Sequence, residues 1–349
     1  MKQSSQELKK FSSQIRFALD NYTPHGISKD SLNAVMICGV GDSGIAGNIV
    51  KDYFQDKLDL PLSTTSGYLL PRYAGRNTLV IVWSYSGDNE EALAVYDIAR
   101  ERGCRLIVIS SGGALSEKAR GQEVTLYPAE AGVSSGMALG YALTYLFQAI
   151  FELLGVYKKP DLLKIAASLE NSNDYLQHSA QLTQHFRESL QYKFIVVCDA
   201  FFEGVASRFC QQVNQVARSE AFINVLPEGG YHVLDSYHQK LNSNFIFLNS
   251  RLSAPTNLRF SQVKKLLEKQ GMEPLELLIA DASLNSLFHI THLLDWVALQ
   301  IAGVAIVSGD VANDNTRPAG TAANITGAAA AGNTAAGTAA RAGITAASS

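Results

Sequence analysis

Two segments of the sequence combine glycine with hydroxyl side chains, the residue types that suit a phosphate group. They are GVGDSGIAG at residues 39–47 and SYSGDNEEA at residues 84–92. Closely spaced glycines let the backbone turn tightly and present amide N–H groups to a ligand. Ser43, Ser84 and Ser86 add hydroxyl donors for the oxygens of an anion. Together the two segments predict a site for a small phosphorylated compound.

The neighbouring residues favour a sugar phosphate over a nucleotide. A Gly-rich loop alone could also bind a dinucleotide or simply turn the chain. However, the sequence lacks the GxxxxGK[ST] lysine of a nucleoside triphosphate site, and no acidic residue follows residues 39–47 where a dinucleotide ribose needs one. Asn89 adds a further side-chain donor in the second segment. We therefore expect a sugar phosphate as ligand and no cofactor.

Each segment follows an apolar run and precedes residues at helical spacing. Strands are predicted at residues 34–38, 78–83 and 105–110, because continuous apolar runs of this kind are typical of parallel strands that are covered on both faces. Parallel strands place their ligands at the carboxyl edge of the sheet, so both segments should meet there. A long buried helix is predicted over residues 137–154.

The second half of the chain repeats the strand–loop–helix order without the serine-rich loops. Strands are predicted at residues 193–200, 244–249 and 275–279, and a final helix at residues 284–302. Beyond about residue 309 the chain is mostly Ala, Gly, Thr, Asn and Ser, which predicts a disordered tail. The expected organisation is an α/β domain with a leading helix (1–156), a helical connector (157–192), a second α/β domain (193–308) and a tail (309–349).

Composition excludes several classes of protein. The 349 residues carry a net charge of -3, so no basic field is available to hold a nucleic acid. Residues 1–22 predict an amphipathic helix rather than a signal peptide, and the apolar stretch at 296–307 is too short to cross a membrane. The cysteines are scattered and no Cys/His spacing matches a metal site, so reduced core thiols and no metal are expected. These features predict a cytoplasmic protein.

The two loops and a third motif give the chain a family resemblance. GVGDSGIAG and WSYSGDNEEA resemble the signature loops of sugar isomerase (SIS) domains, and NVLPEGGYH at residues 224–232 resembles the bifunctional phosphoglucose/phosphomannose isomerase family. The likeness covers most of residues 34–303. It implies two flavodoxin-like three-layer domains with parallel sheets. It also implies a homodimer with the active site at the subunit interface, and aldose–ketose interconversion through a cis-enediolate.

The resemblance carries over well at the phosphate end. Ser43, Ser84 and Ser86 match the family's phosphate-binding serines, and Asn89 stands where threonine is usual. Acids stand at two positions where the family has Gly and Asn, and a carboxylate 4 Å from a phosphate would cost about 1 to 4 kcal/mol. Either these acids, Asp42 and Asp88, point their carboxylates outward or the site is weaker. The predicted substrate-binding residues are Gly41, Asp42, Ser43, Ser84, Tyr85, Ser86 and Asn89.

The chain departs from the family's pattern at the catalytic end. The catalytic glutamate of the family falls on Gln215, whose amide cannot accept a proton at neutral pH. The arginine of the family falls on Gly136, and losing such a donor costs roughly a hundredfold to a thousandfold in rate. The ring-opening histidine falls on Tyr231 or His232. The predicted catalytic residues are His232, Gln215 and Glu228, with Glu220, Glu228 and Asp235 as possible substitutes for the base.

Two functions follow from these residues. The first is an isomerase that converts glucose 6-phosphate or mannose 6-phosphate to fructose 6-phosphate. The alternative is a SIS-domain protein that binds or senses a sugar phosphate without turnover, having lost the catalytic base and the arginine. His289 and His292 stand at helical spacing beside Leu293, which favours core or interface positions over a ligand role.

Overall fold

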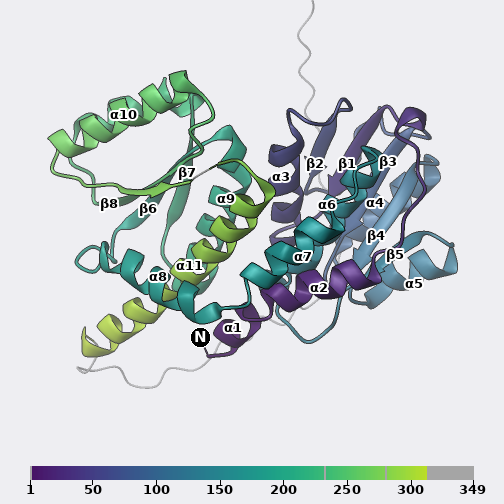
Figure 1. The fold of residues 1–349 in the computed structure, drawn as a ribbon, viewed down its shortest axis with the longest axis horizontal. Helices are drawn as coiled ribbons and strands as arrows, with labels where there is room; N and C mark the ends of the chain where they lie inside the picture. The colour runs from purple at the N-terminus through teal and green to yellow at the C-terminus, as the bar shows by residue number, and fades with distance from the viewer. Residues whose placement is uncertain (1, 232, 280, 313–349) are drawn as a thin grey trace, which may run out of the picture.

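Two parallel β-sheets organise the chain in the computed structural model, which describes residues 2–312 except residues 232 and 280 (Figure 1). The strand order is β2-β1-β3-β4-β5 in the first sheet and β7-β6-β8-β9 in the second. All of the pairings are parallel, and helices cover both sheets, so the predicted α/β class is confirmed. The strands are β1 Ala34–Cys38, β2 Leu62–Thr65, β3 Thr78–Trp83, β4 Arg105–Ser110, β5 Thr125–Pro128, β6 Lys193–Asp199, β7 Ala221–Leu226, β8 Ser243–Asn249 and β9 Leu275–Leu278.

The central strands are buried on both faces, which explains their continuous apolar sequences. Every residue of β3, TLVIVW, is buried. Successive side chains of β1 enter different cores: Val35 and Ile37 join one apolar cluster, and Met36 and Cys38 join another. This alternation follows from the period of two in a strand. Helices therefore pack against both faces of the sheet.

In the first half, α3 Asp42–Phe54, α6 Leu139–Leu153 and α2 Phe11–Asn21 pack on one face of the sheet. The helices α4 Glu90–Glu101 and α5 Gly113–Gly121 pack on the other. The single helix predicted for residues 1–22 is wrong, because α1 Lys2–Leu8 ends before α2 begins. The two helices separate because α2 packs in the core beside α6, whereas Leu8 of α1 packs against Trp296.

In the second half, α9 Glu203–Gln212 and α11 Leu284–Ala312 lie on one face of the sheet and α10 Ala254–Lys269 on the other. A π-helical turn, η4 Val213–Ala217, continues α9. The final helix runs beyond its predicted end at residue 302, and the tail predicted beyond it lies from residue 313 onward outside the described residues. The remaining elements are α7 Lys159–Ser168, α8 Ser172–Gln184, η1 Lys29–Ser31, η2 Ser135–Met137, η3 Ala200–Phe202, η5 Glu228–Gly230 and η6 Leu234–His238.

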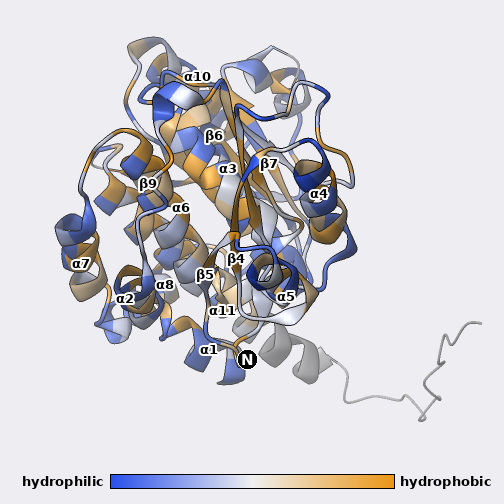
Figure 2. Ribbon diagram, turned by 90° about the vertical axis from the view of Figure 1, so that its right-hand side faces the viewer, coloured by the Kyte–Doolittle hydropathy of each residue, from blue (hydrophilic) through white to orange (hydrophobic). Residues whose placement is uncertain are grey.

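The two halves share one apolar core. Residues from both sheets and from α3, α6, α9 and α11 form a single cluster, and Figure 2 shows hydrophobic colour on the strands and hydrophilic colour on outer helices such as α4 and α5. The helices α3 and α9 approach closely, because a Cβ at Gly204 would lie 2.6 Å from the backbone nitrogen of Ile49. The amide of Gly204 also donates to the buried carboxylate of Asp52 at 2.7 Å. The two halves therefore contact each other along a helix pair.

Candidate functional site

The two predicted phosphate loops lie at the point where the first sheet's connections diverge. The chain leaves β1 through α3 on one face of the sheet and leaves β3 through α4 on the other. Because β1 and β3 are adjacent and parallel, with Cys38 paired to Val82, the two loops leave neighbouring strands at the carboxyl edge of the sheet, where sheets of this kind bind ligands. Residues 39–43 and 84–89 therefore lie at the same edge of the sheet, as the sequence predicted.

The first loop turns sharply into α3. A Cβ at Gly39 would lie 2.8 Å from the backbone carbon of Ser43, so only glycine lets the loop close on the helix. Gly41 precedes the helix with a φ of +57°, a conformation that favours glycine. Ser43 is buried in the first turn of α3, where the helix dipole favours an anion. The loop has the geometry expected of an anion site.

The second loop is organised by Asn89, the residue before α4. Its Oδ1 accepts hydrogen bonds from Ser84 Oγ at 2.7 Å and from Ser86 Oγ at 3.4 Å. The hydroxyl of Ser84 also accepts the amide of Gly87 at 3.2 Å. Tyr85 is directed elsewhere, since its hydroxyl donates to the Glu130 carbonyl at 2.9 Å. Asn89 thus holds both serine hydroxyls close together. Each hydroxyl could donate to an anion in place of Asn89 Oδ1.

The two acids beside the loops each have a partner in the protein. Asp88 accepts the amide of Ala114 at 2.9 Å and so caps the first turn of α5. Asp42 accepts the hydroxyl of Ser135 at 3.1 Å and lies 3.4 Å from Arg208 Nη1. The paired arginine reduces the repulsion that the Asp42 carboxylate would exert on a bound phosphate.

Arg208 is a site residue that the sequence reasoning missed. Its guanidinium is 1 % exposed and contacts the Asp295 carboxylate through Nε at 3.0 Å and Nη2 at 3.1 Å. Nη2 also donates to the Gly136 carbonyl. Burial raises the pKa of Asp295, and the guanidinium opposes that effect. The available signal was that Arg208 and Asp295 are charged residues within otherwise apolar faces of their helices.

Two glutamines of α9, Gln211 and Gln212, lie beside Arg208 and form with it a polar wall next to the first loop. A Cβ at Gly136 would lie 3.5 Å from Gln212 Nε2, and one at Gly41 would lie 3.9 Å from Gln211 Nε2. The side-chain amides of α9 therefore face both the first loop and the position where the family resemblance places an arginine. No sequence motif indicated these contacts, because they depend on how α9 packs against α3.

The predicted catalytic residues lie at different ends of β7. Gln215 is exposed in the π-helical turn that precedes the strand, and its neighbour Val216 packs beside Met137, next to Gly136. Glu228 is exposed at the start of η5, after the strand. Six residues of extended chain separate these ends by roughly 20 Å. Glu220 lies at the same end of β7 as Gln215, whereas His232 lies outside the described residues.

The cysteines and His292 lie in packed, buried surroundings. All four cysteines are free and buried, as predicted, and burial raises the pKa of the Cys210 thiol to about 12. Burial lowers the pKa of His292 to about 3, and its ring stacks on Phe11. Among the described residues, no group of three His, Cys, Asp or Glu side chains is arranged to hold a metal ion.

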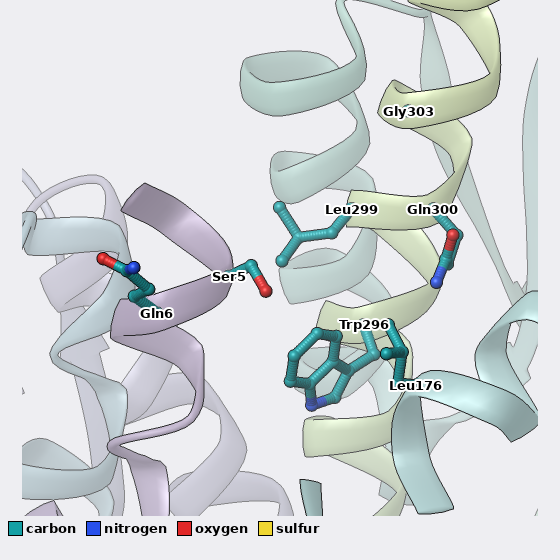
Figure 3. Close-up of a pocket in the computed structure, with 7 residues that line it drawn as sticks. All are labelled: Ser5, Gln6, Leu176, Trp296, Leu299, Gln300 and Gly303. Atoms are coloured by element: carbon teal, nitrogen blue, oxygen red, sulfur yellow. The ribbon is translucent and has the colours of Figure 1, made fainter. Parts of the chain in front are cut away.

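A separate groove lies between α1 and α11, where Ser5 faces Leu299 and Trp296 (Figure 3). Its lining residues include no titratable side chain, so it cannot supply a base for proton transfer. None of the helices in residues 2–312 combines the length and the apolar character that a membrane span requires.

Comparison with known proteins shows what the chain is similar to. Residues 178–307 match the model of the bacterial phospho-glucose isomerase C-terminal SIS domain. The fold resembles glucosamine-6-phosphate deaminase from Thermotoga maritima, with a TM-score of 0.69 and 15% identity over 88% of this chain and 95% of that one. The second half of the chain thus matches a SIS domain, and the fold is similar to that of a protein from the same structural group of sugar-phosphate proteins.

Two curated proteins show similarity over most of the chain or over more than half of it. The chain is 27% identical over 285 residues to the bifunctional phosphoglucose/phosphomannose isomerase of Aquifex aeolicus (strain VF5), which covers 79% of this chain and 87% of the relative. It is also 28% identical over 210 residues to the D-glucosamine-6-phosphate 4-epimerase of Sulfolobus acidocaldarius, covering 60% and 65% of the two chains. The chain is thus a relative of the bifunctional phosphoglucose/phosphomannose isomerases, and the resemblance predicted from its sequence is confirmed.

Proposed function

We propose that this protein is a sugar-phosphate isomerase that interconverts glucose 6-phosphate or mannose 6-phosphate with fructose 6-phosphate. The observation that carries the proposal is the pair of loops that follow β1 and β3, where Ser43 lies in the first turn of α3 and Asn89 accepts the hydroxyls of Ser84 and Ser86. The named activity of the Aquifex aeolicus relative supports the same assignment. In this proposal the phosphate binds to the two loops and the sugar extends toward α9.

The sugar would then lie beside the polar wall that α9 presents. Arg208 holds Asp42 and the Gly136 carbonyl in place and so fixes the position of this wall. Isomerisation also requires a base that moves a proton between C1 and C2. Because the amide of Gln215 cannot do this, we assign the base to a carboxylate, and Glu220 is the candidate on the Gln215 side of β7.

The separation of Gln215 from Glu228 favours a site completed by a second subunit. One subunit would contribute the two loops and α9, and its partner would contribute Glu228 and His232 for ring opening. This arrangement makes the protein a homodimer with the active site at the interface. A cytoplasmic location remains the prediction from the sequence.

A coupled assay on fructose 6-phosphate, glucose 6-phosphate and mannose 6-phosphate tests the proposal. We expect turnover that falls at least about a hundredfold in Glu220→Gln, because general-base catalysis contributes about 10² to 10⁴ in rate. Glu123→Gln, at an acid in the loop that follows α5, is the matched control. Binding of these sugar phosphates without turnover would replace the isomerase by the non-catalytic alternative, and Gln215→Glu would then be the variant expected to create activity.

A further inference from the structure

A cavity lies at the carboxyl edge of the second sheet, at the position equivalent to the two loops of the first sheet. The chain leaves β6 toward α9 on one face and leaves β8 toward α10 on the other, and β6 and β8 are adjacent parallel strands. Connections that diverge in this way open a crevice at the carboxyl ends of the two strands. A cavity of about 180 Å³ lies there, lined by Gln55, Asp199, Ala200, Phe201, Leu226, Pro227, Asn249, Ser250, Leu252, Ser253, Thr256 and Asn257.

The backbone amides that would bind an anion in this crevice are already used. The buried carboxylate of Asp199 accepts the amide of Phe201 at 3.1 Å and that of Ser250 at 2.7 Å. The next two amides donate to side chains of their own loop, Arg251 to Asn249 Oδ1 and Leu252 to Ser250 Oγ. Asp199 thus occupies the place of a bound anion and adds negative charge. A phosphate would meet repulsion here and find few donors.

The remaining lining groups suit a ligand that carries hydroxyls. The Oδ1 of Asn257 is buried and has no hydrogen-bond partner in the described residues, so a ligand that offers a hydrogen-bond donor would satisfy it. A phosphate dianion has no donor to offer, whereas each sugar hydroxyl has one. Phe201 and Leu226 supply apolar surface for the C–H groups of a sugar, and Thr256 supplies a hydroxyl.

We propose that the crevice between β6 and β8 is a second ligand site, for an uncharged monosaccharide or polyol. Its volume of about 180 Å³ suits a small ligand. The site is separate from the two proposed phosphate loops in the first half and does not depend on the activity assigned there. Its selectivity is opposite, because the two phosphate loops offer hydroxyl donors and a helix dipole to an anion, whereas the cavity offers a carboxylate and an acceptor.

Titration of the full chain with D-glucose, followed by NMR, tests this site. With ¹⁵N-labelled asparagine and phenylalanine, D-glucose should shift the Asn257 side-chain amide and the Phe201 backbone amide, with a Kd in the millimolar range. Inorganic phosphate should leave both signals unchanged. Glucose 6-phosphate at saturation, which the two phosphate loops should bind, should change the Kd for D-glucose by no more than about twofold.

Variants of α10 supply the second part of the test. Asn257→Leu should weaken D-glucose binding at least about tenfold, since it removes an acceptor at a buried position. Gln262→Leu, at an exposed position on the same helix outside the cavity, should bind as the unaltered protein does. If Asn257→Leu does not fold, the NMR mapping decides alone. The proposal fails if D-glucose leaves these two signals unchanged, if glucose 6-phosphate displaces it, or if phosphate binds at the same place.

Discussion

The hydroxyl of Ser84 is the group whose contribution to phosphate binding can be isolated most directly. It is buried, and Asn89 fixes its direction at 2.7 Å. Ser84→Ala should raise the KM for the sugar phosphate about tenfold to a hundredfold, because a hydrogen bond to a charged group contributes about 1.5–3 kcal/mol. Steady-state kinetics measure this effect, and Ser13→Ala, on the exposed side of α2, is the control. An unchanged KM would remove Ser84 from the phosphate site.

Arg208 is the buried charged residue that links α9 to Asp42 of α3 and to Asp295 of α11. Arg208→Met should lower the free energy of unfolding by about 3–5 kcal/mol, because it leaves the Asp295 carboxylate buried without its partner. The double variant Arg208→Met/Asp295→Leu should recover part of that loss, since the fully buried carboxylate is then removed together with its partner and only Asp42 loses an ionic contact. Urea unfolding compares the two. Equal stability of the single and double variants would contradict this account.

The sequence indicated the two loops of the candidate site but not the residues of α9 that lie beside them. Ser84, Ser86 and Asn89 lie within six residues of one another, so a local motif places them. Arg208 and Asp42 are far apart in sequence, and their contact arises only when α9 packs on α3. Long-range packing of this kind leaves no local pattern in one sequence beyond a charge at an apolar helical position.

The helix pair α3–α9 is the element on which the relative position of the two halves depends. A Cβ at Gly204 would lie 2.6 Å from the Ile49 backbone, which cannot move independently of its helix. Gly204→Ala should therefore destabilise the protein by about 1–3 kcal/mol through overpacking. Gly121→Ala, at the end of α5 with nothing within 4 Å, should be neutral or slightly stabilising. Thermal unfolding of both variants checks the difference.

The same helix pair gives stability a pH dependence through Asp52. Burial raises the pKa of Asp52 to about 7 from its ordinary value of 3.8, although Lys51 opposes the shift. Between these values the folded state keeps the proton and the unfolded state releases it, so stability falls as pH rises from about 4 to 7. Above pH 7 both states are ionised and this contribution stays constant. Asp52→Asn should reduce the slope in urea unfolding across that range, and an unaltered slope would contradict the assignment.

The predicted strands agree with the structure where the sequence is continuously apolar. The runs that form β1, β3 and β4 are buried between two helical layers, so burial on both faces appears directly in their composition. Two edge strands were not predicted. β2 has the sequence LSTT and is only partly buried, and β7 exposes Phe222 and Ile223. An edge strand pairs on one side only, so its sequence is under weaker constraint.

Assembly of two subunits is the property of the whole molecule that the proposed site requires. If one subunit supplies Ser84 and its partner supplies His232, then Ser84→Ala and His232→Ala dimers should each be impaired. Mixing them after dissociation should restore about a quarter of the unaltered activity, because half of the dimers become heterodimers with one intact site in two. Absence of complementation, with exchange of subunits verified by mass, would place both residues in the same subunit's site.

The ionic contacts of Arg208 limit how the molecule can admit a substrate. They join Asp42 of the first half to Asp295 of the second inside the shared core. Separation of the two halves would break these ion pairs in the protein interior, which solvates charges poorly. We therefore expect a sugar phosphate to reach the loop at residues 84–89 without such a separation, because Ser86 and Asn89 already face the solvent.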